Sequence, residues 1–347
     1  MNPTPRHVPA RLCASALLGL ISFVAAVEAE TLVVANKAEA SVSLIDLASG
    51  QVVATLPAGE GPHEVGISPD ERFALVTNYG RRDAPGRSLT LIDIAAAEVV
   101  RNIDLGDYQR PHGVEWLDES RVAVTAEDDK ALIVVDVETG EVVQKIGTDQ
   151  EVSHMVALDR AGQRAYLTNI GSGSLTVLDL ESGERERNIP TGEGAEGVAV
   201  SGTRIWVTNR GADSLTILDA GTLETVKEIP SEGFPIRATA TPKGQILVTR
   251  ARAGDMVIYD AVDMVEVRRV SFDLKSMDVE ERLFGDRFGD SSVPIGVVVD
   301  NSGEHAFVAH ANADVITEID LASGEVVRTL RAGREPDGMG FSSHPAR

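Results

Sequence analysis

The sequence contains a single cysteine among its 347 residues, Cys13, and this cysteine precedes an apolar N-terminal run. A chain with one thiol forms no internal disulfide, no multi-thiolate zinc site and no covalently attached c-type heme. Aromatic residues make up only 4% of the chain, so the core must consist mainly of Val, Leu, Ile and Ala. Stability is therefore expected to come from the packing of aliphatic side chains alone.

Positive charge is also scarce, and the formal net charge is −22. A chain this acidic repels phosphate backbones, which argues against a nucleic-acid partner. The sequence also lacks a nucleophile–base motif, a phosphate-binding loop and an HExxH motif. These absences favour a binding protein over an enzyme of the common hydrolytic or nucleotide-dependent classes.

The N-terminus has the pattern of an export signal. Arg6 and Arg11 precede an apolar run over residues 16–27, and a small-residue cleavage site ends at Ala29. The apolar run is too short to cross a bilayer comfortably, and no later segment is long enough to do so. We therefore predict a signal peptide over residues 1–29, a periplasmic or secreted location, and one domain over residues 30–347 without a membrane span.

A repeat of about 40–45 residues fills the rest of the chain. An aspartate closes the same apolar run in every unit, and its spacing is 40–47 residues except for a last step of 60. The seven positions are Asp46, Asp93, Asp136, Asp179, Asp219, Asp260 and Asp320. Each of these aspartates precedes a tight turn, where Asp accepts hydrogen bonds from backbone N–H groups, so we interpret the set as structural.

Each unit contains four short runs rich in β-branched residues, separated by Gly, Asn, Asp and Pro. Four strands in a unit of this length are typical of a propeller blade. The first unit begins at its second strand, residues 32–35, and a lone inner strand at residues 338–341 ends the chain. We therefore predict an all-β, seven-bladed β-propeller of four-stranded blades, closed by pairing of the C-terminal strand into the N-terminal blade.

The stretches LVTNY (residues 75–79), LTN (167–169) and VTN (207–209) resemble the YVTN propeller repeat, as do the S-L-T-x-x-D runs that follow them. The resemblance covers all seven units. It implies a seven-bladed propeller of an exported bacterial or archaeal type, mostly a binding module of unknown ligand. Some similar propellers accompany quinone-cofactor alcohol oxidation or form subunits of periplasmic redox enzymes. The sixth unit departs from the pattern, because Arg250 replaces the asparagine.

One column of the repeat is rich in histidine. It lies two residues before the first core valine of each innermost strand, at the predicted mouth of the central channel. In chain order its members are His63, His112, His154, Glu196, Ile236, Ile295 and Asp337. Ring closure would place Asp337 beside His63. Neutral imidazoles with carboxylates suit a divalent transition metal, so His63, His112, His154, Glu196 and Asp337 are candidate ligands. The alternative is a polar rim that binds no metal.

The ends of the second strands are predicted to lie on the same face. Asparagine is the usual residue there, and we interpret it as a structural residue that satisfies the turn backbone. Arg250 and His310 break this rule and are candidate ligand-binding residues. Arg210, with Arg81 and Arg82 on a longer loop, could attract an anion, although a solvated loop would look the same.

The step of 60 residues contains an insertion, residues 271–293, between the sixth and seventh units. It holds three of the eight phenylalanines of the chain, Phe272, Phe284 and Phe288. Long loops of this kind are usually lids or docking elements. We expect it to overhang the channel mouth.

Together, these patterns predict a periplasmic, non-catalytic propeller that binds a small molecule or a protein partner at the channel mouth. Such a protein could be accessory to a redox or transport system, and we expect it to be monomeric. The alternative is a metal-dependent enzyme or metal-binding protein that uses the histidine column, with Glu196 or Asp337 as ligand or base. The sequence identifies neither the ligand nor any cofactor.

Overall fold

The computed structural model describes residues 1, 4, 30–159, 163–275, 282 and 284–346. The predicted signal peptide, except for residues 1 and 4, lies outside the described residues, as do residues 276–281 and 283 of the insertion. Within the described part of the chain, no helix is long and apolar enough to cross a membrane.

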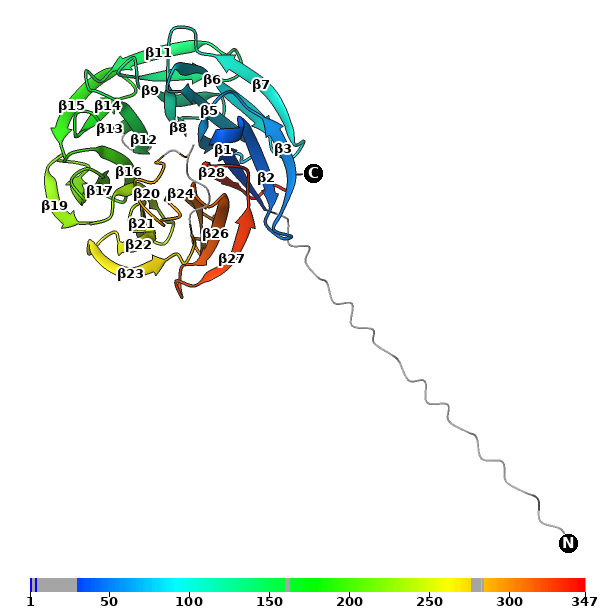
Figure 1. Cartoon of the computed structure of the whole chain (residues 1–347). Helices are drawn as coiled ribbons and strands as arrows, with labels where there is room; N and C mark the ends of the chain where they lie inside the picture. Colours follow the sequence, from blue (N-terminus) through cyan, green and yellow to red (C-terminus); the bar gives the residue numbers. More distant parts are fainter. Residues whose placement is uncertain (2–3, 5–29, 160–162, 276–281, 283, 347) are drawn as a thin grey trace.

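The described residues form seven four-stranded antiparallel sheets arranged in a ring around a central axis (Figure 1). Blade 1 consists of β28 (Pro336–Ser342), β1 (Thr31–Asn36), β2 (Ser41–Asp46) and β3 (Gln51–Pro57), from the axis outwards, with the short 3-10 helix η1 (Lys37–Glu39) between β1 and β2. Blade 2 consists of β4 (Pro62–Ile67), β5 (Phe73–Arg81), β6 (Ala84–Asp93) and β7 (Glu98–Asp104). Blade 3 consists of β8 (Pro111–Trp116), β9 (Arg121–Ala126), β10 (Ala131–Asp136) and β11 (Val142–Gly147).

The remaining four blades follow the same order. Blade 4 consists of β12 (Ser153–Asp159), β13 (Arg164–Asn169), β14 (Ser174–Asp179) and β15 (Glu184–Pro190). Blade 5 consists of β16 (Ala195–Ser201), β17 (Arg204–Asn209), β18 (Ser214–Asp219) and β19 (Thr225–Pro230). Blade 6 consists of β20 (Pro235–Ala240), β21 (Gln245–Arg250), β22 (Asp255–Asp260) and β23 (Val265–Ser271). Blade 7 consists of β24 (Pro294–Val299), β25 (His305–His310), β26 (Val315–Asp320) and β27 (Val326–Arg331).

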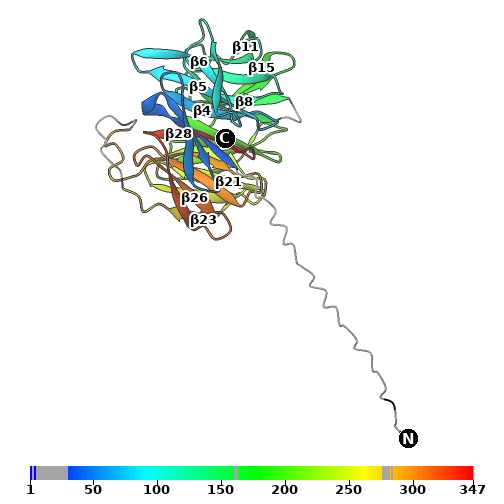
Figure 2. The same ribbon diagram turned by 90° about the vertical axis from the view of Figure 1, so that its right-hand side faces the viewer.

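The ring closes through the two ends of the described domain. β28 pairs antiparallel with β1, and Leu32 lies opposite Phe341 while Val34 lies opposite Met339. Figures 1 and 2 show the red C-terminal strand beside the blue N-terminal strand. Closure therefore leaves no inner sheet edge free for pairing with another chain. The predicted fold class, including this closure, is confirmed.

The core lies between the blades. One cluster contains Val33 and Leu44 of blade 1 and Val76 and Ile92 of blade 2, all fully buried. The middle strands of each blade are buried on both faces because each packs against both neighbouring blades, whereas the outermost strands are largely exposed. The core therefore consists of thin layers between neighbouring blades, and aliphatic side chains are large enough to fill them.

The polar residues that recur in each repeat satisfy the backbone at the two ends of the strands. Asp46 accepts a hydrogen bond from the N–H of Ser49 at 2.6 Å, as expected for an aspartate that precedes a tight turn. At the channel end, Asn78 donates to the hydroxyl groups of Ser88 and Thr90, both at 3.0 Å, and accepts from the N–H of Gly59. Both columns are therefore structural.

Arg250 and His310 occupy the asparagine column and, like the asparagines, make hydrogen bonds within their own blades. That they also bind a ligand stays a prediction. Arg250 is 4% exposed and makes two hydrogen bonds to the carboxylate of Asp255, at 2.7 and 2.5 Å. His310 is fully buried, and its ring nitrogens lie 2.9 Å from the hydroxyl oxygens of Ser292 and Thr317. In both cases the side chain turns into its own blade and away from the channel.

Deletion of residues 335–347 should abolish cooperative unfolding. It removes β28, and the chain would then expose the inner edge of β1 together with unpaired polar backbone groups. Circular dichroism melting and size-exclusion chromatography of the truncated protein measure the effect. A soluble monomer with an unchanged melting curve would contradict closure through β28.

His310 should make the protein less stable in mild acid. Burial lowers the pKa of His310 to about 3 from an ordinary value of 6.5, so below about pH 6.5 only the unfolded chain takes up this proton. The unfolded state then binds more protons, and the free energy of unfolding falls by about 1.4 kcal/mol per pH unit between roughly pH 6 and 3. His310→Asn, which introduces the residue that four of the other six blades have at this position, should remove this component.

Urea unfolding of both proteins at pH 7 and pH 4.5 measures the difference. The stability of the variant relative to the parent protein should rise as the pH falls. Parallel pH profiles for the two proteins would show that His310 does not have the lowered pKa.

Candidate functional site

A β-bulge at the start of each innermost strand brings the histidine column into the channel. In blade 2, Pro62 pairs with Asn78 and Val65 pairs with Val76, so β4 carries one residue more than β5 between these pairs. The same shift occurs on the innermost strands of blades 3 to 7. A bulge disrupts the alternation of a strand. Consecutive residues such as His63 and Glu64 can therefore both face the axis.

The threonine that precedes the asparagine column fixes this bulge. The hydroxyl group of Thr125 accepts the N–H of Gly113 within blade 3 at 2.8 Å and donates to the carbonyl oxygen of His154 in blade 4 at 2.6 Å. Thr77 makes the equivalent bonds to Glu64 and His112, at 3.0 and 2.9 Å. Each threonine thus ties the backbone of one histidine-column residue to the preceding blade.

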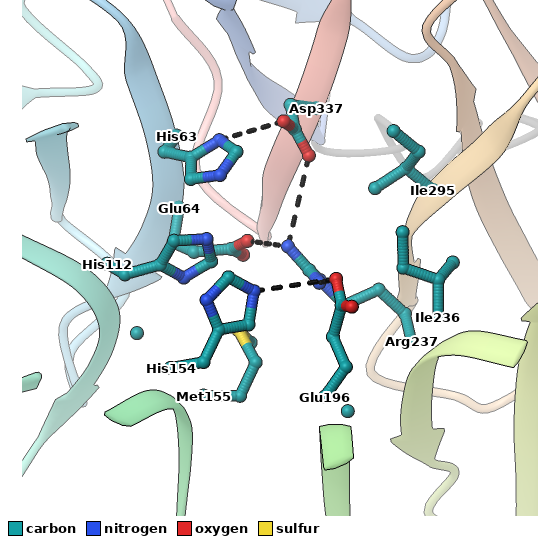
Figure 3. A network of polar contacts seen from close by, with 12 residues as sticks. His63, Glu64, His112, His154, Met155, Glu196, Ile236, Arg237, Ile295 and Asp337 are labelled. Carbon is teal, nitrogen blue, oxygen red and sulfur yellow. Dashed lines mark hydrogen bonds and ion pairs between the residues drawn. The ribbon is translucent and has the colours of Figure 1, made fainter. Parts of the chain in front are cut away.

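Three levels of side chains surround the channel on this side of the ring. The upper level comes from the residue that follows the asparagine column in blades 1 to 5 and contains Lys37, Tyr79, Glu127, Ile170 and Arg210. The middle level is the histidine column, in which His63, His154, Glu196, Ile236, Ile295 and Asp337 line a cavity of about 330 Å³. The lower level is the next residue of each innermost strand and contains Glu64, Met155 and Arg237 (Figure 3).

The three imidazoles lie in contact. The ring centroids of His63 and His112 are 4.1 Å apart, and those of His112 and His154 are 3.5 Å apart. Figure 3 shows the three rings side by side along one wall, opposite Ile236 and Ile295. The column predicted from the sequence therefore converges on a single site.

Carboxylates orient the two outer imidazoles. Nδ1 of His63 lies 2.8 Å from Asp337, the neighbour that ring closure predicted, and Nε2 of His63 lies 3.3 Å from Nζ of Lys37. Nδ1 of His154 lies 2.5 Å from Glu127, which also accepts a hydrogen bond from the hydroxyl group of Tyr79 at 2.5 Å. A carboxylate on Nδ1 is the arrangement that usually holds a metal-ligating histidine.

His112 lies between these two rings and is fully buried. Within the described part of the chain, neither of its ring nitrogens has a hydrogen-bond partner. A buried imidazole without a partner costs free energy, because its polar atoms lose water and gain nothing in exchange. Ligand atoms of His112, Glu127 and His154 lie within 4.8 Å of one another, which is close enough to hold one metal ion.

The surroundings separate the pKa values of the three histidines. Burial, reinforced by the positive charge of its two histidine neighbours, holds the pKa of His112 well below the ordinary value. Burial also lowers the pKa of His63, and it outweighs the opposing effect of Asp337. Burial acts in the same direction on His154, but Glu127 and Glu196 outweigh it and raise the pKa of His154.

Opposite charges pair along the rest of the wall. Arg210 and Arg237 both contact the carboxylate of Glu196, with Nη1 of Arg237 3.4 Å from Oε1. Burial opposes ionisation of Glu196, but His154 and the two arginines lower its pKa to about 2. Three cations and three carboxylates line the cavity. The formal charges of these six groups therefore sum to zero.

Blades 6 and 7 supply the apolar side of the cavity. Ile236 and Ile295 belong to these blades, and Phe284 from the insertion also lines the cavity. Phe284 packs against Phe234 and Phe288, with ring centroids 5.8 and 4.9 Å away. The insertion thus contributes a wall of the site through the residues that the structure describes.

The predicted site residues are only partly brought together. The five candidate metal ligands all belong to the channel-mouth site, as does Arg210. Of the described residues, however, only His112, Glu127 and His154 have ligand atoms close enough together for one metal ion. Arg81 and Arg82 are exposed on the β5–β6 hairpin and do not line the cavity. The carbonyl groups of Arg81 and Arg82 accept hydrogen bonds from Arg110 at 3.3 and 3.0 Å.

Sequence reasoning missed Lys37, Tyr79, Glu127 and Arg237. The first three directly follow the asparagine column, in which most residues serve the backbone. The position after that column varies from blade to blade, Lys, Tyr, Glu, Ile and Arg in the first five. The asparagine column is nearly uniform, whereas the position after it differs in chemistry from blade to blade. This contrast could have identified Lys37, Tyr79 and Glu127 from the sequence.

Comparison with known proteins gives two family matches and many similar solved structures. Residues 13–122 match the family described as YNCE-like beta-propeller, and residues 117–292 match the family described as Cytochrome D1 heme domain. The solved structure titled Kuenenia stuttgartiensis hydrazine synthase is similar with a TM-score of 0.67 and 20% sequence identity, over 84% of this chain and 92% of that chain. This structural likeness supports the propeller fold alone. No curated protein sequence matches the chain significantly.

The family matches confirm a β-propeller family and correct the predicted function. A non-catalytic docking module was expected, but the larger match is to a heme domain of a cytochrome, which connects the chain with redox chemistry. The prediction of a non-catalytic module is therefore wrong. Because this match covers just over half of the 347 residues, the protein belongs to the Cytochrome D1 heme domain family.

Proposed function

We propose that this propeller binds a heme-type iron tetrapyrrole at the channel mouth and takes part in a redox process. The observation that carries the proposal is His112, a fully buried imidazole with two unpartnered ring nitrogens, flanked by two imidazoles that carboxylates orient. Histidine is a common axial ligand of heme iron. The family match gives independent support.

The residues of the cavity suit the different parts of such a cofactor. His63, His112 and His154 would supply the iron ligand or ligands, and Lys37 and Arg210 would pair with carboxylate substituents at the edge. Ile236, Ile295 and Phe284 would contact the apolar ring. The cavity volume of about 330 Å³ lies at the small end of ligand clefts, but Lys37 and Arg210 are partly exposed, so the site opens at the propeller face.

Because the sequence has one cysteine and no Cys-x-x-Cys-His motif, this cofactor would be held without the paired thioether bonds of c-type heme. A bound heme supplies iron that changes oxidation state and binds small molecules. The chain itself orients the imidazoles through Asp337 and Glu127, keeps water from the buried side of the ring, and balances charge through the Glu196–arginine pairs. The exported location predicted from the N-terminus and the YVTN-type repeats are compatible with such a role.

Purified protein should bind hemin, with the red-shifted, intensified Soret absorption that histidine ligation causes. His112→Ala should weaken binding, as should His63→Ala and His154→Ala. Glu127→Gln and Asp337→Asn keep the side-chain shape and should lower affinity by about 10- to 100-fold, the usual cost of losing a residue that orients a metal ligand. Absorption titration gives the affinities.

His305→Ala is the matched control, because His305 is partly exposed at the start of β25 and does not line the cavity. It should bind hemin like the parent protein. Equal hemin binding by the parent protein and by a variant lacking His63, His112 and His154 would contradict the proposal. So would elemental analysis that finds a bare metal ion held by these residues in a protein that takes up no heme.

A further inference from the structure

A second cavity lies between blades 3 and 4, at the end of the strands opposite the channel mouth. Its volume is about 680 Å³, within the range of about 300–1,000 Å³ that is usual for small-molecule clefts. The strands β11 and β15, the outermost of these two blades, are neighbours at the rim of the ring (Figure 1). We name this space the interblade cavity.

At most other blade boundaries, a cationic side chain closes the corresponding space. One position of each outermost strand pairs with the residue two before the repeated aspartate. In four blades this position carries a cation that donates a hydrogen bond to a backbone carbonyl in the turn between the third and fourth strands of the next blade, namely Arg101, Lys227, Arg268 and Arg328. For example, Nη2 of Arg328 lies 2.6 Å from the carbonyl oxygen of Leu47. We name this position the bridging position.

Two further boundaries are closed in other ways. Between blades 4 and 5, Nη1 of Arg164 donates to the carbonyl oxygen of Ala220 at 3.0 Å. Between blades 1 and 2 the bridging position is Ala54, which packs in an apolar cluster with Ile94 and Ala97. The boundary between blades 3 and 4 therefore differs from the other six.

Blade 3 has Gln144 at the bridging position, opposite Val134 in the sheet. The side chain of Gln144 still extends over the turn of blade 4, because a Cβ on Gly183 would lie 2.6 Å from Nε2 of Gln144. Glutamine is shorter than arginine, however, and it places a neutral amide where the other blades place a cation. The interblade cavity opens at this point, and Gln144, Leu180 and Glu181 are part of its lining.

The apolar part of the lining suits a hydrocarbon stem. Leu117, Leu158 and Leu180 line the interblade cavity and are only partly buried against the core. Covering three half-exposed leucines would remove apolar surface from water. A ligand of this cavity is therefore expected to carry an apolar portion.

The charged part of the lining favours a cation. Asp159 and Glu181 contribute two carboxylates. Arg121 is the one cation among the described lining residues, and it pairs with Asp118 at 2.7 Å. A positively charged ligand would meet opposite charges as well as the turn carbonyls that bind cations at the other boundaries.

From this comparison of the blades we propose that the interblade cavity binds a small organic cation, a guanidinium or primary ammonium group on an apolar stem. The cationic group would donate to the carbonyl oxygens of residues 180 and 181, as Arg101 donates to those of Val137 and Glu138 in blade 3. The stem would cover the leucines. This site is separate from the channel mouth, and the proposal holds with or without a bound heme.

Hexylguanidinium and hexylurea test the need for charge, because they have the same shape and only the first is charged. Hexylguanidinium should bind the full chain about tenfold or more tightly than hexylurea, since hydrogen bonds from a charged donor are the stronger ones. Titration of ¹⁵N-labelled protein in about 0.15 M salt, which screens attraction to the acidic surface, gives both affinities and should shift the amide resonances of Gln144 and Glu181. Equal affinities for the two compounds would overturn the proposal.

Gln144→Arg tests the place of binding. This variant supplies from the chain the cation that four other blades have, so the affinity for hexylguanidinium should fall about tenfold or more. Val143→Arg is the matched control, because it adds the same charge at a neighbouring position that is 54% exposed and does not line the cavity. It should bind like the parent protein. An unchanged affinity in Gln144→Arg, or an equal loss in both variants, would contradict the proposed site.

Discussion

The site depends on one hydrogen-bonding arrangement, the threonine hydroxyl that joins two blades at each β-bulge. In blades 2 to 5 it accepts an N–H from the lower-level residue of its own blade and donates to the carbonyl group of the histidine-column residue in the next. The bond holds the innermost strands in a fixed relation around the axis. This fixed relation allows imidazoles from three separate sheets to lie with neighbouring ring centroids 3.5 to 4.1 Å apart.

Threonine and asparagine provide the hydrogen bonds that the backbone needs at the channel end of each blade. The side chains that face the channel can therefore differ from blade to blade. A symmetric scaffold can therefore hold an asymmetric site. Blades 1 to 5 supply all of the titratable and charged groups except Arg237 of blade 6, and blades 6 and 7 supply Ile236 and Ile295 with Phe284 of the insertion. A site with one polar and one apolar wall is suited to a cofactor that has both a metal and an extended apolar ring.

Buried charge in the channel is tolerated because the charged groups pair with one another, both within a blade and between blades. Asp337 contacts His63 and Lys37, Glu196 contacts Arg210 and Arg237, and Arg237 also reaches Glu64. Removing one member would leave its partner charged and buried, at a cost of about 3–5 kcal/mol. The Arg237–Glu64 pair joins blades 6 and 2 across the axis (Figure 3).

The sequence by itself determined the number of blades, the strand order, the closure of the ring and the column that holds the three histidines, because each follows from a short repeated pattern. It even placed Asp337 beside His63, since closure makes the last strand a neighbour of blade 2. Only the tertiary structure decided which residues join them. At the ends of the second strands, the residue that faces the channel is the one after the asparagine column, and this brings Lys37, Tyr79 and Glu127 into the site. The side chains of Arg250 and His310 point into their own blades, where they make hydrogen bonds, and not into the channel. Arg237 and Glu64 are 173 positions apart and meet only because the ring closes, and no local pattern encodes such a meeting.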